Sequence, residues 1–272
     1  MTEFFRLSGG GNDFLALLEP EREPSSEQIR AWCARGLSLG ADGLFLLRRT
    51  PGGVRMDHFN ADGRPAELCI NGTRCAALLA MTLEWSGSEL VVETGAGPVP
   101  ARRVGEHGIA LTLPTPAAPD ELVLEVDGDE LPGWRVDSGV PHFVTIWPRP
   151  LGQAPVAELG PRLRTHPALG EAGANVDFVR FPGTDRLEIR TFERGVEAET
   201  LACGTGVLAA CAVGLTDGRL QTPIQALTAG GFALTVDSAG EERLTLAGDA
   251  RLLASGRLWP EAGELPEPPL WS

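Results

Sequence analysis

The sequence predicts a mixed α/β (α+β) fold with two pseudo-symmetric lobes, each a curled, mostly antiparallel sheet around a central helix. Two stretches, 60–80 and 193–213, both run from acidic residues through Cys-x-[Asn/Thr]-Gly into an Ala- and Leu-rich segment. A second pair of similar stretches, 11–14 and 174–178, contains Asn followed by Asp-Phe. Short apolar runs between Gly, Pro and Asn turns fill most of the remaining chain, as is typical of strands.

Each Ala-rich segment predicts a helix that begins directly after a cysteine. The run from Thr73 to Trp85 is almost wholly apolar, so this helix should be buried on all sides within a surrounding sheet. Cys69 and Cys203 would then lie at helix N-termini. The unpaired N–H groups and the positive end of the helix dipole favour a thiolate at that position.

The first lobe is expected to span residues 1–115 and to include the C-terminal tail from about 255 to 272. Ser25 is the expected N-cap of a helix that ends near Arg35. The Pro-rich stretch 114–119 is interpreted as the linker. Strands are expected at 3–7, 14–18, 44–47, 54–59, 89–94, 98–104 and 108–113.

The second lobe, 116–254, repeats this arrangement. A helical stretch is expected at about 153–166, before the Cys203 helix. The tail 260–272 is Pro-rich and either loosely attached or lies across the first lobe. Strands are expected near 122–126, 133–138, 142–147, 175–181 and 185–193, with three more between 225 and 253.

Composition excludes several classes of protein. With 272 residues, a net charge of −14 and no basic patch, the chain should not bind nucleic acid or an anionic membrane. The N-terminus has no targeting pattern and no segment is long and apolar enough to span a bilayer, so we expect a cytoplasmic protein. The chain has no Lys, which excludes a pyridoxal phosphate Schiff base and a Walker P-loop.

The five cysteines are odd in number and irregularly spaced, so we expect reduced thiols rather than a disulfide framework. If Cys69 and Cys203 face each other, one as thiolate and one as thiol, they form an acid–base pair. Such a pair can remove a proton from one face of a carbon and return one to the other face. A neighbouring carboxylate could bind the helix N-termini, with Asn12, Asn71 and Thr205 as further donors.

Other roles for these cysteines stay open at this point. A metal site is disfavoured, because the cysteines lack close C-x-x-C spacing and the four His are scattered. A Cys-His nucleophile with His142 would not account for two matched Cys turns. A purely structural role, with two small buried residues starting two core helices, remains an alternative.

The motifs resemble those of the diaminopimelate epimerase family and occur in the family order over nearly the whole chain. They are Gly11-Asn12-Asp13-Phe14, Asn60-Ala61-Asp62-Gly63 through Cys69-Ile70-Asn71-Gly72-Thr73-Arg74-Cys75, Gly139-Val140-Pro141-His142, Ala174-Asn175-Val176, and Glu193-Arg194-Gly195 through Ala202-Cys203-Gly204-Thr205-Gly206.

This resemblance implies a cofactor-independent isomerase without a metal that converts LL- to meso-diaminopimelate in lysine biosynthesis, and we expect a homodimer. Cys69 and Cys203 would be the two bases. By this resemblance, the carboxylate at the reacting centre is bound by Asn12, Asn71, Gly204, Thr205 and the N–H of Ile70. The distal end of the substrate is bound by Asn60, Asn175, Glu193 and Arg194. The pKa values of the two thiols are modulated by His142 and Glu193.

The sequence departs from the family pattern at three positions. Ile70 stands where the family has a Gly that lets the backbone approach the carboxylate. Val140 replaces an Asn, which removes a polar group from the distal pocket, and Ser8 stands where His is usual. The alternatives are therefore a two-cysteine racemase of another amino acid, or a non-catalytic relative that binds a metabolite.

Overall fold

The structure is a computed structural model that describes residues 2–240 and 242–264. The chain divides into two compact units, Met1–Ile109 with Ala250–Ser272, and Ala110–Asp249. The boundaries expected from the sequence, after residues 115 and 254, lie a few residues further along the chain. We describe each unit by itself.

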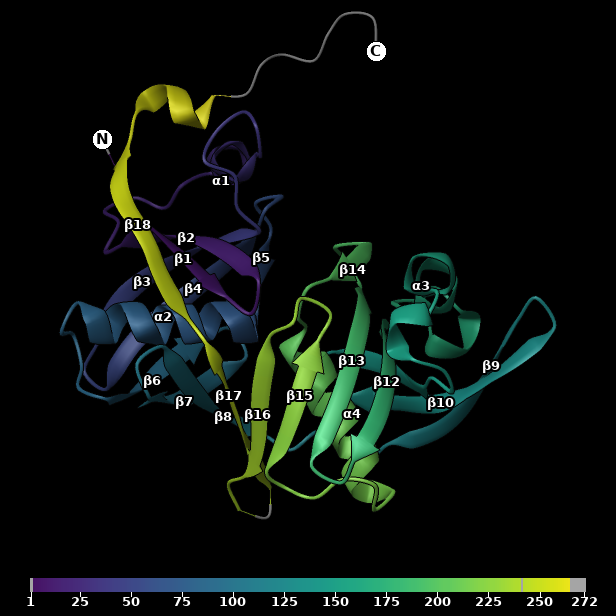
Figure 1. Cartoon of the computed structure of the whole chain (residues 1–272). Coiled ribbons are helices and arrows are strands. Elements are labelled where there is room, and N and C mark those ends of the chain that lie inside the picture. Colours follow the sequence, from purple (N-terminus) through teal and green to yellow (C-terminus); the bar gives the residue numbers. More distant parts are fainter. Residues whose placement is uncertain (1, 241, 265–272) are drawn as a thin grey trace, which may run out of the picture. The chain divides into compact units, whose positions relative to one another are not determined.

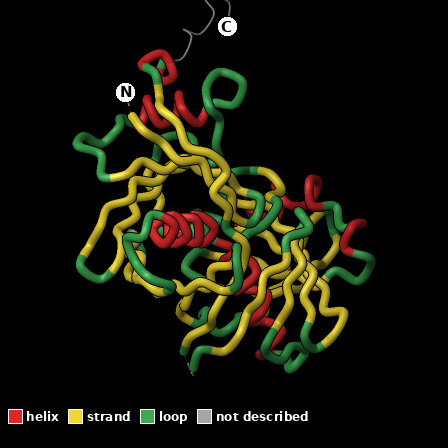
Figure 2. The backbone as a smooth tube through the Cα atoms, turned by 60° about the vertical axis from the view of Figure 1, so that its left-hand side comes forward, coloured by secondary structure: helices red, strands yellow, loops and turns green. Residues whose placement is uncertain are grey.

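In the first unit a curled sheet encloses one helix. Pairing gives the strand order β18–β1–β2–β3–β4–β6–β7, with β5 on β4, and only β2–β3 and β4–β6 are parallel. Helix α2 (Ile70–Thr82) contacts every long strand of this sheet, which Figure 2 shows arching around it. The strands are β1 (Thr2–Gly9), β2 (Asn12–Leu18), β3 (Gly43–Thr50), β4 (Gly53–Asn60), β5 (Pro65–Ala66), β6 (Glu89–Thr94), β7 (Gly97–Val104) and β18 (Arg251–Leu258).

Helix α2 is buried on all sides, as its sequence predicts. Every residue from Ile70 to Met81 is buried. The helix begins directly after Cys69, as expected, since Cys69 is the N-cap and its Sγ accepts the Gly72 N–H. It ends at Thr82, before the expected Trp85.

Helix α1 (Ser26–Cys33) confirms the expected N-cap. Ser25 and Gln28 form a reciprocal capping box. The helix ends before the expected Arg35, because Ala34 is already extended. The short helix η3 (Pro260–Gly263) packs against α1, and the Ser38 hydroxyl donates to the Ala262 carbonyl at 2.9 Å. The tail thus belongs to this unit as far as residue 264, and residues 265–272 of the expected tail lie outside the described part.

The second unit has the strand order β9–β10–β11–β12–β13–β15–β16–β17–β8, with β14 on β13. Helix α4 (Gly204–Thr216) packs on β10 to β13, and α3 (Val156–Arg164) also packs on this sheet (Figure 1). The unit boundary falls within β8. The remaining elements are β8 (Gly108–Pro114), β9 (Asp120–Val126), β10 (Asp129–Asp137), β11 (Pro141–Ile146), η1 (Leu151–Gln153), η2 (Pro167–Leu169), β12 (Asn175–Gly183), β13 (Arg186–Glu193), β14 (Ala198–Thr200), β15 (Ile224–Thr228), β16 (Ala233–Ser238) and β17 (Arg243–Asp249).

Both units repeat one order of elements. A hairpin, a helix, a second hairpin, a short strand and the Cys helix follow each other as β1–β2, α1, β3–β4, β5, α2 and as β10–β11, α3, β12–β13, β14, α4. The parallel pairs also fall at corresponding places, β2–β3 and β11–β12, then β4–β6 and β13–β15. The internal repeat expected from the two Cys stretches is therefore present in the topology.

The second proposed sequence repeat, between 11–14 and 174–178, is wrong. Asn12 begins β2, whose counterpart is β11, whereas Asn175 begins β12, whose counterpart is β3. By register, Phe14 pairs with Gly43 and His142 pairs with Asn175. His142 thus corresponds to Phe14, and Asn175 to Gly43.

The strand predictions missed β5 and β14, each of two or three residues. They also placed three strands between 225 and 253, where the chain forms four, the last reaching Leu258. No helix in the described part of the chain is long and apolar enough to cross a membrane.

Candidate functional site

Cys69 lies half-buried at the N-terminus of α2. Its Sγ is 3.4 Å from the Gly72 nitrogen, and its carbonyl accepts the Thr73 hydroxyl at 2.9 Å. The neighbouring Ile70 is buried and does not have positive φ. The Ile at this position therefore causes no backbone strain, although the side chain is bulkier than a Gly.

Asn12 and Asn71, both expected in the carboxylate site, are brought together in the first unit. The Asn71 amide donates to Asn12 Oδ1 at 2.7 Å, and the buried Arg74 guanidinium donates to Asn71 Oδ1 at 2.7 Å. Gly10, at φ +59°, approaches this pair so closely that a Cβ there would lie 3.1 Å from both Asn71 and Arg74. Asn60 lies at the exposed end of β4.

Asp13 of the Asn-Asp-Phe motif has a structural role. Its carboxylate binds the guanidinium groups of Arg6 and Arg35, and the backbone N–H of Asp42 donates to its Oδ1 at 3.2 Å. Burial opposes ionisation, but the hydrogen bonds from Arg35 and Arg6 hold the pKa of Asp13 below its usual value. This anchor fixes the turn that presents Asn12.

Cys203 lies at the N-terminus of α4, and its residue is 8% exposed. Its Sγ is 3.3 Å from the Thr205 hydroxyl. Burial, followed by the charges of Glu193 and Asp177, raises the pKa of Cys203 well above its ordinary value, although Thr205 and the Gly206 N–H act in the opposite direction. Desolvation therefore opposes the thiolate that the helix N-terminus would favour at Cys203.

A buried polar chain extends from Thr205 into the second unit. The His142 ring lies with Nε2 3.0 Å from Thr205 Oγ1 and Nδ1 2.6 Å from Asp177 Oδ2. The Thr191 hydroxyl donates to the other Asp177 oxygen at 2.7 Å. Sequence analysis missed Asp177 and Thr191. The available signal was period-two alternation, which places Asp177 on the same face of β12 as Asn175.

The structure places Asn175 beside His142 and Arg194. Asn175 Oδ1 accepts the Arg194 backbone N–H at 2.7 Å, and Asn175 Nδ2 lies 3.3 Å from His142 Nε2. Glu193 is the last residue of β13, and Gly204 is the buried first residue of α4. The second unit therefore brings together the expected residues Cys203, Gly204, Thr205, His142, Asn175, Glu193 and Arg194.

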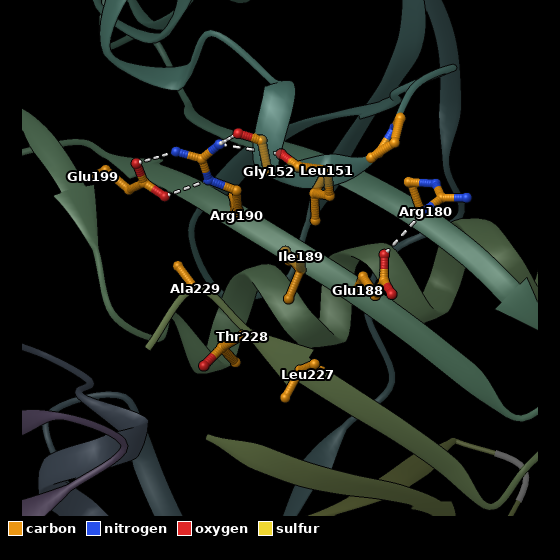
Figure 3. A pocket seen from close by; sticks show the side chains of 11 residues that line it. Leu151, Gly152, Arg180, Glu188, Ile189, Arg190, Glu199, Leu227, Thr228 and Ala229 are labelled. Atoms are coloured by element: carbon orange, nitrogen blue, oxygen red, sulfur yellow. Dashed lines mark hydrogen bonds and ion pairs between the residues drawn. The ribbon is translucent and has the colours of Figure 1, made fainter. Parts of the chain in front are cut away.

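A separate cavity of about 570 Å³ in the second unit contains none of the expected residues (Figure 3). Its charged side chains are paired with each other. Arg190 donates to both oxygens of Glu199 at 2.7 Å and to the Leu151 carbonyl at 3.1 Å, while Arg180 pairs with Glu188. Arg190 thus holds η1 and β14 on the sheet, and Arg180 with Glu188 joins β12 to β13, so we interpret this cavity as structural.

Among the described residues, no cluster of His, Cys, Asp or Glu could hold a metal ion. None of the five cysteines forms a disulfide.

His58, on β4, provides a first testable prediction. The ring is buried against Phe14, its Nδ1 has no hydrogen-bond partner, and burial lowers its pKa to about 4. The unfolded chain takes up a proton near pH 6.5, whereas folded His58 does not. Stability should therefore fall as the pH drops below 6.5, by about 2 kcal/mol at pH 5.

We expect His58→Leu to remove this loss, so that the variant gains about 2 kcal/mol relative to the unmodified protein between pH 8 and pH 5. Urea unfolding at both pH values measures this difference. Equal pH dependence in the two proteins would show that His58 is protonated in the folded state. At pH 8 the His58→Leu variant should be at least as stable as the unmodified protein, because it no longer buries a ring nitrogen without a hydrogen-bond partner.

A family model described as diaminopimelate epimerase matches residues 4–110 and 135–253. Relatives with that name include proteins from Aquifex aeolicus, 37% identical over 96% of this chain and 99% of the relative, and Methanothrix thermoacetophila, 39% identical over 88% and 90%. Structures with a similar fold include a PhzF family protein from Enterococcus faecalis (TM-score 0.72, 17% identity, covering 95% and 99%) and a probable proline racemase from Agrobacterium radiobacter (0.70, 14%, covering 97% and 96%). These structural similarities confirm the expected fold class.

Proposed function

Since this chain belongs to the diaminopimelate epimerase family and is an isomerase, we propose that it epimerises LL-diaminopimelate to meso-diaminopimelate by two-base proton transfer between thiols. Cys69 and Cys203 would act on opposite faces of the α-carbon. The observation that supports this most directly is that both cysteines are helix N-caps.

The reaction needs one thiolate and one thiol. The thiolate takes the α-proton, the electron pair passes into the adjacent carboxylate as an enediolate, and the thiol returns a proton to the opposite face. One S–H bond forms and one breaks, so the enzyme ends with the two protonation states exchanged. No electron acceptor or cofactor is required for this step.

The carboxylate at the reacting centre would be held by groups at the two helix N-termini. Asn71 and Asn12 supply amides in the first unit, and Gly204 and Thr205 begin α4 in the second. Backbone N–H groups at a helix start also stabilise the developing enediolate, since they are already oriented before the reaction. We assign the N–H of Ile70 to the same task.

The distal amino and carboxylate groups would be bound by Asn60, Asn175, Glu193 and Arg194. Asn175 already holds the Arg194 backbone, so these two residues act as one unit. The cytoplasmic location and the homodimer remain predictions of the sequence.

Solvent deuterium incorporation at the α-carbon tests the proposed function. Incorporation with inversion is expected for diaminopimelate. Incorporation only for another amino acid would replace the substrate assignment, and no incorporation on any amino acid would overturn the proton-transfer assignment.

Val140, half-buried in the turn that leads to His142, gives a second prediction. A hydrogen bond to a charged group contributes roughly 1.5 to 3 kcal/mol, equal to about 10- to 150-fold in rate. If Val140 lies in the distal pocket, Val140→Asn should raise kcat/KM for meso-diaminopimelate at least several-fold. Amino acids without a distal group serve as the control and should not benefit. An unchanged or lower kcat/KM for meso-diaminopimelate in Val140→Asn would favour a different amino-acid substrate.

A further inference from the structure

The buried chain behind Cys203 includes a carboxylate that the family motifs do not assign. We propose that Asp177 is a positioning residue that holds His142 as the Nδ1–H tautomer, so that Thr205 can carry the Cys203 proton to and from the imidazole. This inference rests on the proposed function, because it assigns a proton path to one of the two thiols.

The neighbouring amide determines which ring nitrogen carries the proton. The Arg194 N–H donates to Asn175 Oδ1 at 2.7 Å, which fixes Oδ1 and Nδ2 in their observed positions. Asn175 Nδ2 can only donate, and it lies 3.3 Å from His142 Nε2 and 3.4 Å from the Pro141 carbonyl, which accepts one of its protons. A proton on Nε2 would face this N–H group, whereas Nδ1 lies 2.6 Å from Asp177 Oδ2, which is an acceptor. The ring proton is therefore placed on Nδ1, which leaves the Nε2 lone pair as an acceptor.

The direction of the next two hydrogen bonds follows from this tautomer. Thr205 has one hydroxyl proton, which it donates to His142 Nε2 at 3.0 Å. Its oxygen lone pairs then face the Cys203 thiol at 3.3 Å, so the S–H donates to Thr205. The chain runs in one direction, from Cys203 through Thr205 and His142 to Asp177.

A proton can move along this chain without a net change of charge. The S–H bond of Cys203 breaks as a new O–H bond forms on Thr205, and the original Thr205 O–H breaks as an N–H bond forms on Nε2. The products are a thiolate and an imidazolium, the latter beside the buried carboxylate of Asp177. The reverse transfer restores the thiol. Cys203 can thus release its proton to His142 and recover it without bulk water.

Asp177 is itself held in place for this task. Its second oxygen accepts the Thr191 hydroxyl at 2.7 Å, and both His142 and Asp177 are fully buried. A carboxylate with two partners and no solvent is fixed in orientation, and its charge stabilises an imidazolium on the same ring.

The first unit has no counterpart to this pair. By strand register, His142 corresponds to Phe14, and the pair Asp177–Thr191 corresponds to Phe45–His58. Phe14 packs against Phe45 and His58 with ring centroids 6.3 and 5.7 Å apart. Phe14 and Phe45 have no group that can bind or release a proton, so the first unit has no imidazole at the position of His142 and no carboxylate at the position of Asp177.

The test is Asp177→Asn, which keeps the shape of the side chain and removes its charge. The Asn amide can turn its NH₂ to His142 Nδ1, which would move the ring proton to Nε2 and reverse the chain. We expect kcat to fall at least about 100-fold with KM changed less than about 3-fold. Thr191→Val is the matched control, because it removes a hydrogen bond to the same carboxylate but keeps the charge. It should stay within about 10-fold of the original kcat.

Nitrogen-15 NMR of the His142 ring provides a readout that does not depend on activity. The unmodified protein should show a protonated Nδ1 and Asp177→Asn a protonated Nε2, while Thr191→Val should keep the original tautomer. A protonated Nε2 in the unmodified protein overturns the inference even if the variant does not fold. So does an Asp177→Asn protein with unchanged kcat. A parallel fall in kcat and thermal stability in both variants, with no change of tautomer, would show a purely structural role.

Failure of the proposed function is distinguishable from failure of this inference. If Cys203→Ala retains activity, the thiol assignment is wrong whatever the tautomer. If Cys203→Ala is inactive while Asp177→Asn behaves like the unmodified protein, the thiol assignment holds and the role of Asp177 is wrong.

Discussion

Replacing either Cys69 or Cys203 by Ala is expected to abolish inversion of diaminopimelate. Each variant lacks the group that serves one face of the α-carbon, and loss of a general acid or base typically costs 10²-fold or more. The measurement is the rate at which the LL isomer appears from the meso isomer, and the reverse. A rate above about a tenth of the original in either variant would contradict the two-base assignment.

Deuterium exchange makes this test more specific. A single remaining thiol can still remove a proton and return a solvent deuteron on the same face, so exchange without inversion is possible in either variant. Such exchange should be confined to one configuration at the α-carbon, opposite for the two variants. Exchange in both configurations with one cysteine missing would mean that another group serves as the second base.

The same two helices offer matched controls. Cys75 lies in α2 and Cys211 in α4, and both are completely buried. Cys75→Ala and Cys211→Ala remove a thiol from the same helix without removing the N-cap. We expect both variants to keep most of the epimerase activity, with stability lowered by about 1 kcal/mol for the small cavity created. Loss of activity in these controls would indicate that the effect of Cys→Ala is on folding.

The sequence was sufficient to predict the two buried helices and the cysteines that begin them. Apolar residues on every side of a helix can be accommodated only inside a surrounding sheet, and α2 and α4 have that composition. The N-cap at Ser25 could also be predicted, because a capping box depends only on residues three positions apart in the sequence. These features are local, so a single sequence contains them.

The features that sequence analysis missed depend on contacts between distant segments. Asp177 meets His142 across the parallel pair β11–β12, and neither the pairing nor its register can be read from either strand alone. The similarity of Asn12 and Asn175 suggested equivalence, but they begin non-equivalent strands. The raised pKa of Cys203 arises from burial and from charges on other strands, which outweigh the local effect of the helix N-terminus.

The close approach of α4 to the Asp177 carboxylate gives the second large prediction, which concerns Gly206. This residue follows Cys203 by three positions, and a Cβ built on it would lie 2.5 Å from Asp177 Oδ1 and 3.2 Å from Thr191 Oγ1. Both atoms belong to buried, hydrogen-bonded side chains with no room to withdraw. Gly206→Ala should therefore push the first turn of α4 away from β12 and lengthen the contacts between Thr205 and His142.

We expect Gly206→Ala to lower the free energy of unfolding by roughly 1 to 3 kcal/mol, as overpacking does, and to lower kcat more than about 10-fold. Gly72→Ala, at the corresponding position after Cys69, is the matched control. There the atoms nearest to a Cβ would be the flexible end of Met56 at 3.0 Å, Cys69 Sγ at 3.4 Å and Cys69 Cβ at 3.5 Å. Because Ala favours a helix over Gly by about 0.5 to 1 kcal/mol, this control should be nearly neutral in stability. Urea unfolding of both variants measures the difference, and an equal loss of stability would show that the carboxylate does not restrict the α4 N-terminus.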